Sequence, residues 1–165
     1  MRISIPMVLA GIVIYFVIVA RFTLYDITAS IVISLIASVI VGGLVAENPW
    51  KMLSPRRICS AVAYIIYYLF VIEPRCHLNV AAMILGLKPY KPDIVPVPYS
   101  YETDYGVAAA ANSITNTPGT LVVDIDPDEK VMQVHWMEAV TRDPVETYRR
   151  ILGVFDKWIK RIFEG

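Results

Sequence analysis

Charged residues are scarce in this sequence, and the shortage is greatest near its start. Of the 165 residues only 18% are charged and 56% are hydrophobic, whereas soluble globular domains average about 25% charged residues. Almost all of the charges follow Ala46, and the 15 basic and 15 acidic residues cancel. This even balance gives no sign of a nucleic-acid partner. The composition predicts instead a membrane protein, with room for a small membrane part and a small soluble part.

Cysteine is equally rare. Cys59 and Cys76 stand too far apart for a C-x-x-C redox or zinc motif, so we expect both to be small buried hydrophobic residues. The sequence offers no other catalytic, cofactor-binding or metal-binding pattern. We therefore expect neither a cofactor nor a metal ion.

Two uninterrupted apolar runs predict two membrane spans. Residues 3–20 form a run of about 18 residues and residues 27–46 one of about 20, each close to the length needed to cross a hydrocarbon core of about 30 Å as a helix. The linker 21–26 is so short that the spans must form a hairpin, which makes 1–57 a membrane domain. A cleaved signal peptide is the alternative for the first run, but the run is longer than the usual apolar region of such peptides.

The basic residues around the hairpin predict its orientation. Arg2 lies at one mouth together with Lys51, Arg56 and Arg57, whereas Arg21 is alone at the other. Cytoplasmic flanks carry the excess of lysine and arginine. We therefore expect a multi-pass plasma-membrane protein with both ends of the hairpin, and the C-terminal domain, in the cytoplasm.

The third apolar segment is too short for a comfortable span. Residues 58–72 are apolar, but a Glu-Pro-Arg triplet follows at 73–75, and the segment becomes amphipathic when continued to Leu87. This pattern favours a helix at the membrane surface or tilted against partner helices. With the proline-rich linker it would occupy 58–92, and whether it crosses the bilayer stays open.

Residues 93–165 predict a small cytoplasmic α+β domain of the order β-α-β-β-α, close to a truncated ferredoxin-like fold. Its elements are an edge strand at 94–101, a helix capped by Thr103 or Asp104, a hairpin of strands at 121–126 and 131–137, and a final helix.

The final helix carries the clearest local signals. Asp143 can cap it, Pro144 fits its first position, and Glu146 completes a carboxylate version of the capping box. Apolar residues then recur at three-and-four spacing, which predicts one buried face. They are Val145, Tyr148, Ile151, Leu152, Phe155, Trp158, Ile159 and Ile162.

The predicted spans offer no chemistry for moving ions. Neither contains an Asp, Glu, His, Lys or Arg between its ends, and ion paths within membranes need such residues or broken helices. The second span instead carries a stripe of small residues four apart, which suits close helix packing against either the first span or another subunit. This small-residue stripe consists of Ser30, Ser34, Ser38, Gly42 and Ala46.

Two ionisable residues elsewhere are candidates for chemistry. Glu73 lies near membrane depth beside Arg75 and His77, so a proton path is an alternative, but such an acid more often reaches water or pairs with a neighbouring base. His135 stands next to Trp136 without a nucleophile or ligand pattern. A structural or partner-facing histidine is therefore favoured over a catalytic one.

The densest polar stretch is residues 111–120. Its Thr117-Pro118-Gly119-Thr120 sequence suits a type II turn, since proline presets the first central position and glycine supplies the positive φ at the second. An anion or nucleotide site is the alternative, but the stretch lacks lysine and the spacing of phosphate-binding loops. We favour a turn whose hydroxyls bond their own backbone.

The same stretch carries a family resemblance. The run from Asn112 to Thr120, followed by Val123-Asp124 and Val134-His135-Trp136, resembles the pattern "NSITLTPGT…VD…VHW" of the E subunits of Mrp/Mnh-type multisubunit sodium/proton antiporters. Asn79-Val80 and the segment 92–98 are similar to the family's "N-x-V…P-x-I-V-x-V-P". Asn116 replaces the family's usual leucine. Pro74-Arg75 interrupts a helix that is usually smoother.

The resemblance implies an accessory, non-catalytic subunit that supports the assembly of a sodium/proton-translocating complex, with the ion paths in larger subunits. Related modules occur in archaeal membrane-bound hydrogenases, and the sequence does not separate the two settings. The expected partners are other membrane subunits and the lipid bilayer. The alternative is a stand-alone membrane-anchored ligand-binding or regulatory domain.

Two groups of residues are candidates for contacts. The aromatic candidates for interface anchors are Trp136, Trp158 and Phe163. The candidate interface or structural residues are Ser30, Ser34, Ser38, Gly42, Glu73, Asn112, Thr117, Pro118, Gly119, Thr120, His135 and Trp136.

Overall fold

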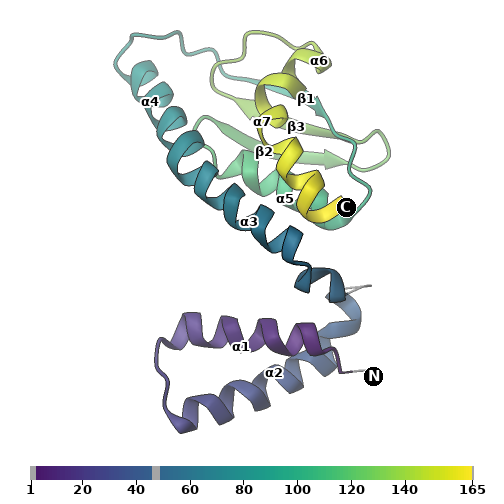
Figure 1. Cartoon of the computed structure of the whole chain (residues 1–165). Helices are drawn as coiled ribbons and strands as arrows, with labels where there is room; N and C mark the ends of the chain where they lie inside the picture. Colours follow the sequence, from purple (N-terminus) through teal and green to yellow (C-terminus); the bar gives the residue numbers. More distant parts are fainter. Residues whose placement is uncertain (1–2, 46–48, 165) are drawn as a thin grey trace. The chain divides into compact units, whose positions relative to one another are not determined.

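The computed structural model describes residues 3–45 and 49–164 and divides the chain into two compact units, Met1–Ile58 and Cys59–Gly165 (Figure 1). The first unit holds α1 (Ile5–Val19), α2 (Leu24–Val45) and the 3-10 helix η1 (Pro49–Leu53). Arg2, used above for the orientation, and Ala46, the last member of the small-residue stripe, lie outside the described residues.

The helix α2 begins earlier than predicted. It starts at Leu24 because Thr23 and Asp26 form a reciprocal capping box: the Asp26 N–H donates to Thr23 Oγ1 (3.2 Å), and the Thr23 N–H donates to Asp26 Oδ2 (3.2 Å). The prediction that 21–26 is a linker was therefore wrong at its end. An acidic residue belongs to the first turn of this apolar helix.

The helices α1 and α2 pack along each other through small residues. Ser38 Oγ accepts a hydrogen bond from the Ser4 N–H (3.0 Å) and donates to Ser4 O (3.3 Å). A Cβ added to Gly11 would lie 2.7 Å from Ser34 Oγ, so the two backbones approach closely at this point. Side chains larger than these would hold the helices apart.

The segments α3 (Pro55–Tyr67), η2 (Tyr68–Ile72) and α4 (Glu73–Ile84) form one continuous helix of 30 residues, the long helix, at 55–84. Among the described residues it alone is long and apolar enough to cross a membrane, by length and composition. The stretches Ile5–Val19 and Leu24–Ile40 are shorter apolar helices. The spans predicted at 3–20 and 27–46 therefore stay predictions.

Two expectations about the long helix were wrong. Pro74 does not interrupt it, because the preceding turn is a π-helix in which the Glu73 N–H reaches Tyr68 O, and this wider turn accommodates a residue that has no N–H to donate. Cys59 is exposed and Cys76 only partly buried, since the position of Cys59 faces away from the rest of the second unit.

The second unit contains a three-stranded antiparallel sheet. The strands β1 (Asp93–Pro98), β2 (Thr120–Asp126) and β3 (Val131–Trp136) lie in the order β1-β3-β2, with a bulge in β2 between Val122 and Asp124. The predicted strands are confirmed, although β1 ends at Pro98 rather than Tyr101. Its prolines are tolerated because β1 pairs on one side only.

Helices follow the strands as predicted. The helix α5 (Asp104–Thr115) is capped by Thr103, whose Oγ1 accepts from the Gly106 N–H at 3.1 Å. The final helix consists of α6 (Pro144–Thr147), the π-helix η3 (Tyr148–Leu152), α7 (Gly153–Ile159) and the π-helix η4 (Lys160–Glu164). The expected order of strands and helices in this region is confirmed.

The start of the final helix differs from the prediction in two details. Asp143 caps it by accepting from the Glu146 N–H (2.9 Å), but the Glu146 carboxylate accepts from Arg149 and Arg150 instead of completing a capping box. Val145, predicted on the buried face, is exposed. Thr147 takes the inward position instead, because its hydroxyl donates to Pro96 O (2.5 Å).

The core of the second unit lies on one face of the sheet. Alternate residues of β1 and β3 meet α5 and the final helix there, and Ile72 of the long helix joins the same cluster. The fully buried apolar residues include Val95, Val97, Met132, Val134, Ile114, Leu152 and Ile159. The fold is thus a helical N-terminal region with a long apolar helix, followed by a small antiparallel sheet covered by helices.

Candidate functional site

The polar stretch 111–120 forms the end of α5 and a tight turn into β2. The turn is closed by the Thr120 N–H, which donates to Thr117 O at 3.2 Å, and Gly119 adopts a φ of +98°. This is the positive φ predicted for the second central position of the turn. Asn112 is exposed, and Pro118 is partly buried.

The hydroxyl groups of this stretch are used internally. Thr117 Oγ1 donates to Ser113 O (2.7 Å), and Thr120 Oγ1 donates to Ile114 O (2.7 Å). Ser113 Oγ donates to Ala109 O (2.7 Å). Hydroxyls that bond their own backbone do not present donors to an anion, so the geometry supports the turn rather than a phosphate site.

The register of the sheet brings the two halves of the motif together. Thr120 pairs with Trp136, and Leu121 pairs with His135, although some 15 positions separate them along the chain. The Met137 N–H also donates to Gly119 O at 3.0 Å. Trp136 and Phe163 are partly buried and pack against the core of the second unit.

His135 lies between apolar neighbours. Its cross-strand partners are Ile94 on β1 and Leu121 on β2, both about half exposed. Since Met132 and Val134 face the core, His135 points to the other face of the sheet. No nucleophile or acid pairs with it across the strands of the described sheet, which agrees with a structural or partner-facing role.

Two tyrosines of the long helix, which the sequence analysis missed, contact the motif. Tyr64 Oη lies 2.6 Å from Ser113 Oγ, and because Ser113 gives its only proton to Ala109 O, the tyrosine is the donor. Tyr68 Oη lies 3.5 Å from Thr117 Oγ1. The rings of Tyr64 and Tyr67 also pack on Trp158, with centroids 6.1 and 5.8 Å away.

A second polar contact joins the C-terminal part of the long helix to the end of β3. Asn79 Nδ2 donates to Glu138 Oε2 at 2.9 Å. Lys88 donates to Asn79 Oδ1 and lies 3.7 Å from Glu138 Oε1. Asn79 was noted only through the family resemblance, and Glu138 carried no local signal. The motif residues therefore fasten the long helix at two places, to the C-terminal end of α5 and to the segment after β3.

The carboxylate of Glu73 lies beside a histidine of the same helix. Its Oε2 lies 3.1 Å from Nδ1 of His77, one helical turn later. Among the described residues no three histidine, cysteine, aspartate or glutamate side chains gather in a way that could hold a metal ion. Pairing with a neighbouring base is the arrangement favoured for Glu73, and the Tyr68 side chain on the preceding turn also interacts with it.

The serines of the small-residue stripe face α1 within the first unit. Ser30, Ser34 and Ser38 are all buried, Ser34 against Gly11 and Ser38 against Ser4. Gly42 belongs to α2. These contacts support packing of the serines against the first predicted span rather than against another subunit, since α1 already covers them at Gly11 and Ser4.

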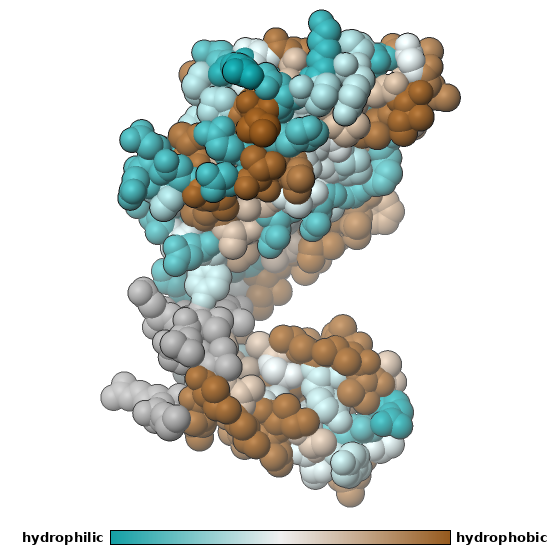
Figure 2. Space-filling view, turned by 180° about the vertical axis from the view of Figure 1, so that it is seen from behind, coloured by the Kyte–Doolittle hydropathy of each residue, from teal (hydrophilic) through white to brown (hydrophobic). Residues whose placement is uncertain are grey.

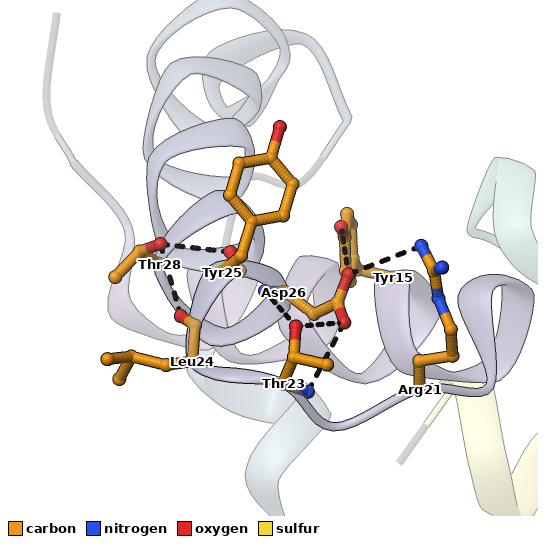
Figure 3. Close-up of polar contacts among 7 residues, drawn as sticks. All are labelled: Tyr15, Arg21, Thr23, Leu24, Tyr25, Asp26 and Thr28. Carbon is orange, nitrogen blue, oxygen red and sulfur yellow. Dashed lines mark hydrogen bonds and ion pairs between the residues drawn. The ribbon is translucent and has the colours of Figure 1, made fainter.

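Asp26 closes the loop end of the α1–α2 pair. Besides its capping box it accepts from Tyr15 Oη (3.4 Å) and lies 3.7 Å from the Arg21 guanidinium (Figure 3). The residue is 1% exposed, so a carboxylate is buried with a hydrogen-bond donor on each side. The T-x-x-D spacing of residues 23–26 was the signal in the sequence that could have placed this carboxylate in the first turn of α2.

The surfaces of the two units differ in character. Viewed from behind, the first unit is mostly apolar, whereas the second unit shows apolar patches among polar side chains (Figure 2). The exposed apolar residues of the second unit on β1 and β2 include Ile94, Leu121 and Val123.

Comparison with solved structures places this architecture in a class. A chain in the structure of the membrane-bound sulfane sulfur reductase, an archaeal respiratory membrane complex, matches with a TM-score of 0.77 and 28% sequence identity. The match covers 96% of this chain and 100% of that chain. The fold is thus one found in a chain of a membrane complex.

The family follows from a match that extends over nearly the whole sequence. The family model described as Na+/H+ ion antiporter subunit matches residues 8–162, and the chain belongs to this family. The E-type Na(+)/H(+) antiporter subunit of Alkalihalophilus pseudofirmus is 32% identical over 82 residues, which are 46% of this chain and 52% of that protein. The match spans about half the length of this curated relative.

Proposed function

We propose that this chain is an accessory, non-catalytic subunit of a multisubunit monovalent cation/proton antiporter, or of an antiporter-like module in a membrane-bound respiratory complex. Its family and its similarity to a chain of a respiratory membrane complex support this role. The observation that carries the proposal is the use of the motif: its hydroxyls join the long helix to the end of α5, and its asparagine at position 79 joins the helix to the segment after β3. Polar groups that are already hydrogen-bonded within the protein serve a structural role, as expected of a scaffold subunit.

Membrane placement is part of the proposal. The helices α1 and α2 would cross the membrane as a hairpin within 1–57, 58–92 would form the membrane-associated helix and linker, and 93–165 would form a cytoplasmic domain. Large exposed apolar side chains on α1 and α2 support the hairpin. The order β1-β3-β2, with both neighbours antiparallel, is that of a ferredoxin-like sheet without its last strand.

The partners would be the other membrane subunits. The ion paths would lie in them, because no ionisable residue lies in the described part of α2 beyond its first turn. A stand-alone ligand-binding domain is less well supported. The hydroxyls that would bind its ligand already bond to the protein's own backbone.

Purification of the tagged chain from its native membrane under mild detergent tests the proposal. We expect large antiporter-like subunits to be identified in the eluate by mass spectrometry, and oxidoreductase subunits among them would distinguish a respiratory complex from an antiporter. A tagged membrane protein of similar size and unrelated fold is the control. A monodisperse chain without partners would contradict the proposal.

A further inference from the structure

The outer side of the long helix is apolar along most of its length. Its inner side contacts the rest of the second unit through Tyr64, Tyr68, Ile72 and Asn79. The opposite side, here called the outer face, is solvent-exposed throughout. It is formed by Val62, Ile66, Leu69, Phe70 and Leu78.

Length and composition alone would make this helix a membrane span. Its contacts argue against that. The positions from Tyr64 to Asn79 cover about 22 Å of helix axis at 1.5 Å per residue, most of a hydrocarbon core of about 30 Å. The α+β part of the unit contacts the helix at both ends of this distance: α5 and α7 meet it at Tyr64, and Glu138 meets it at Asn79. Figure 1 shows α5 beside α3. A spanning helix would carry that part into the hydrocarbon.

The α+β part cannot enter the hydrocarbon at an acceptable cost. The outer edges of β1 and β2 have no neighbour in the described sheet, and open sheet edges do not occur in lipid. The charged groups of Lys88 and Glu138 also sit at the contact with the helix. The packing therefore excludes a crossing orientation for this unit.

We propose that the long helix lies in the plane of the membrane surface, with its outer face in the boundary between headgroups and acyl chains. The chain itself keeps the helix near the surface, since only residues 46–54 separate it from the apolar helix α2. Arg56 and Arg75 of this helix are exposed and suit anionic headgroups. This inference rests on the proposed membrane placement of α1 and α2 and adds the orientation of the second unit.

Spin-label depth measurements on the full chain test the orientation. Single cysteines would replace Val62, Phe70 and Leu78 in a C59S/C76S background, and the labelled protein would be reconstituted into phosphatidylethanolamine–phosphatidylglycerol vesicles. Accessibility to oxygen and to a water-soluble nickel reagent gives the depth of each label. A helix in the surface plane places all three at a similar shallow depth, about 5–10 Å below the headgroups. A spanning helix places Phe70 about 12 Å deeper than the other two.

Reference labels separate the possible failures. Val13→Cys on α1 reports whether the predicted hairpin enters the bilayer, Ile72→Cys reports the protein-covered side of the long helix, and Asp128→Cys reports water. If the Val13 label lies deep in the bilayer and Phe70 is the deepest of the long-helix labels, the surface orientation is wrong. The proposed function would not be affected by that result. The surface orientation is also overturned if the labels at Val62, Phe70 and Leu78 are all in contact with water or with protein and none with lipid. A water-exposed Val13 label contradicts the membrane placement as well.

Discussion

The two units of this chain bury opposite kinds of side chain. In the described part of the first unit the fully buried residues are small or polar, while large aliphatic and aromatic side chains such as Val17 (77% exposed) point outward. The buried set is Pro6, Asp26, Ser30, Ser34 and Ser38. In the second unit the core consists of Val, Ile, Leu, Met, Phe, Tyr and Ala side chains, in the manner of a water-soluble domain.

This contrast supports the proposed placement of the first unit in lipid and of the second in water. Water drives large apolar side chains into a core, whereas lipid is as apolar as leucine and leaves close backbone approach and interhelical hydrogen bonds to hold helices together. The α1–α2 pair has a close backbone approach at Gly11 and an interhelical hydrogen bond at Ser38. The second unit uses a core on one face of its sheet. The changes below test whether each unit follows its own rule.

The largest effect is expected from Leu152→Ala. Leu152 is fully buried in the core of the second unit, so its truncation removes apolar burial and leaves a cavity that costs about 2–5 kcal/mol of unfolding free energy. Urea unfolding of the full chain in detergent, followed by tryptophan fluorescence, measures this loss. Val145→Ala, at an exposed position of the same helix, should change it by less than about 0.5 kcal/mol. Equal effects would contradict the assigned core.

Gly11→Ala tests the packing rule of the first unit. The added methyl group would lie 2.9 Å from Ser34 Cβ, so α1 and α2 must separate, and overpacking of this kind costs about 1–3 kcal/mol. Spin labels on the exposed Val13 and Ile36 should show a longer or broader distance distribution. The double variant Gly11→Ala/Ser34→Gly should restore it. An unchanged distance in the single variant would show that the helices do not meet at Gly11.

Tyr64→Phe tests the contact between the long helix and the motif. It removes the hydrogen bond to Ser113 while keeping the ring on Trp158, and should cost about 0.5–1.5 kcal/mol of unfolding free energy. A double-mutant cycle with Ser113→Ala isolates the pair. Tyr90→Phe, at an exposed position, is the matched control. Additive effects of the Tyr64 and Ser113 changes would mean that the two hydroxyls are not coupled.

Glu164 should give the smallest effect, and one that depends on pH. Partial burial alone would raise its pKa, but hydrogen bonds from Thr103 and from the Glu102 and Thr103 N–H groups outweigh burial and hold the pKa below its usual range. A carboxyl group whose pKa is lowered in the folded state stabilises the fold at pH values above its unfolded-state pKa of about 4.3. This stabilisation is lost as the pH falls through the folded-state pKa. Glu164→Gln should therefore lower the melting temperature at neutral pH.

The difference between wild type and Glu164→Gln should shrink as the pH falls below about 4, because the wild-type carboxylate is then protonated as well. Thermal unfolding from pH 3 to 7 measures it. Glu129→Gln, in the exposed β2–β3 turn, is the control. A difference that stays constant over this range would show that the charge of Glu164 does not contribute.

Local signals made much of the second unit predictable. The caps at Thr103 and Asp143, the turn at Gly119 and the alternation of β2 and β3 each act within a few residues, so the sequence contains all that they need. The same holds for the capping box of Thr23 and Asp26, which was overlooked because the apolar pattern begins only at Ile27.

Contacts between distant residues were not predictable from one sequence. Tyr64 and Ser113 are 49 positions apart, and Asn79 and Glu138 are 59 apart, so no periodicity relates them. The family resemblance marked Ser113 and Asn79 without indicating their partners. His135 and Leu121 likewise met only once the strands had paired.

The sequence by itself determined which segments form helices and strands, the apolar character of the N-terminal region and the family, because these depend on composition, short spacings and a contiguous motif. Only the tertiary structure decided what each element faces. It turned the serines of α2 toward α1, and it covered one side of the long helix with the sheet domain. Orientation depends on packing between residues far apart in the chain, and a helix with two apolar sides does not show in its own sequence which side the protein will cover.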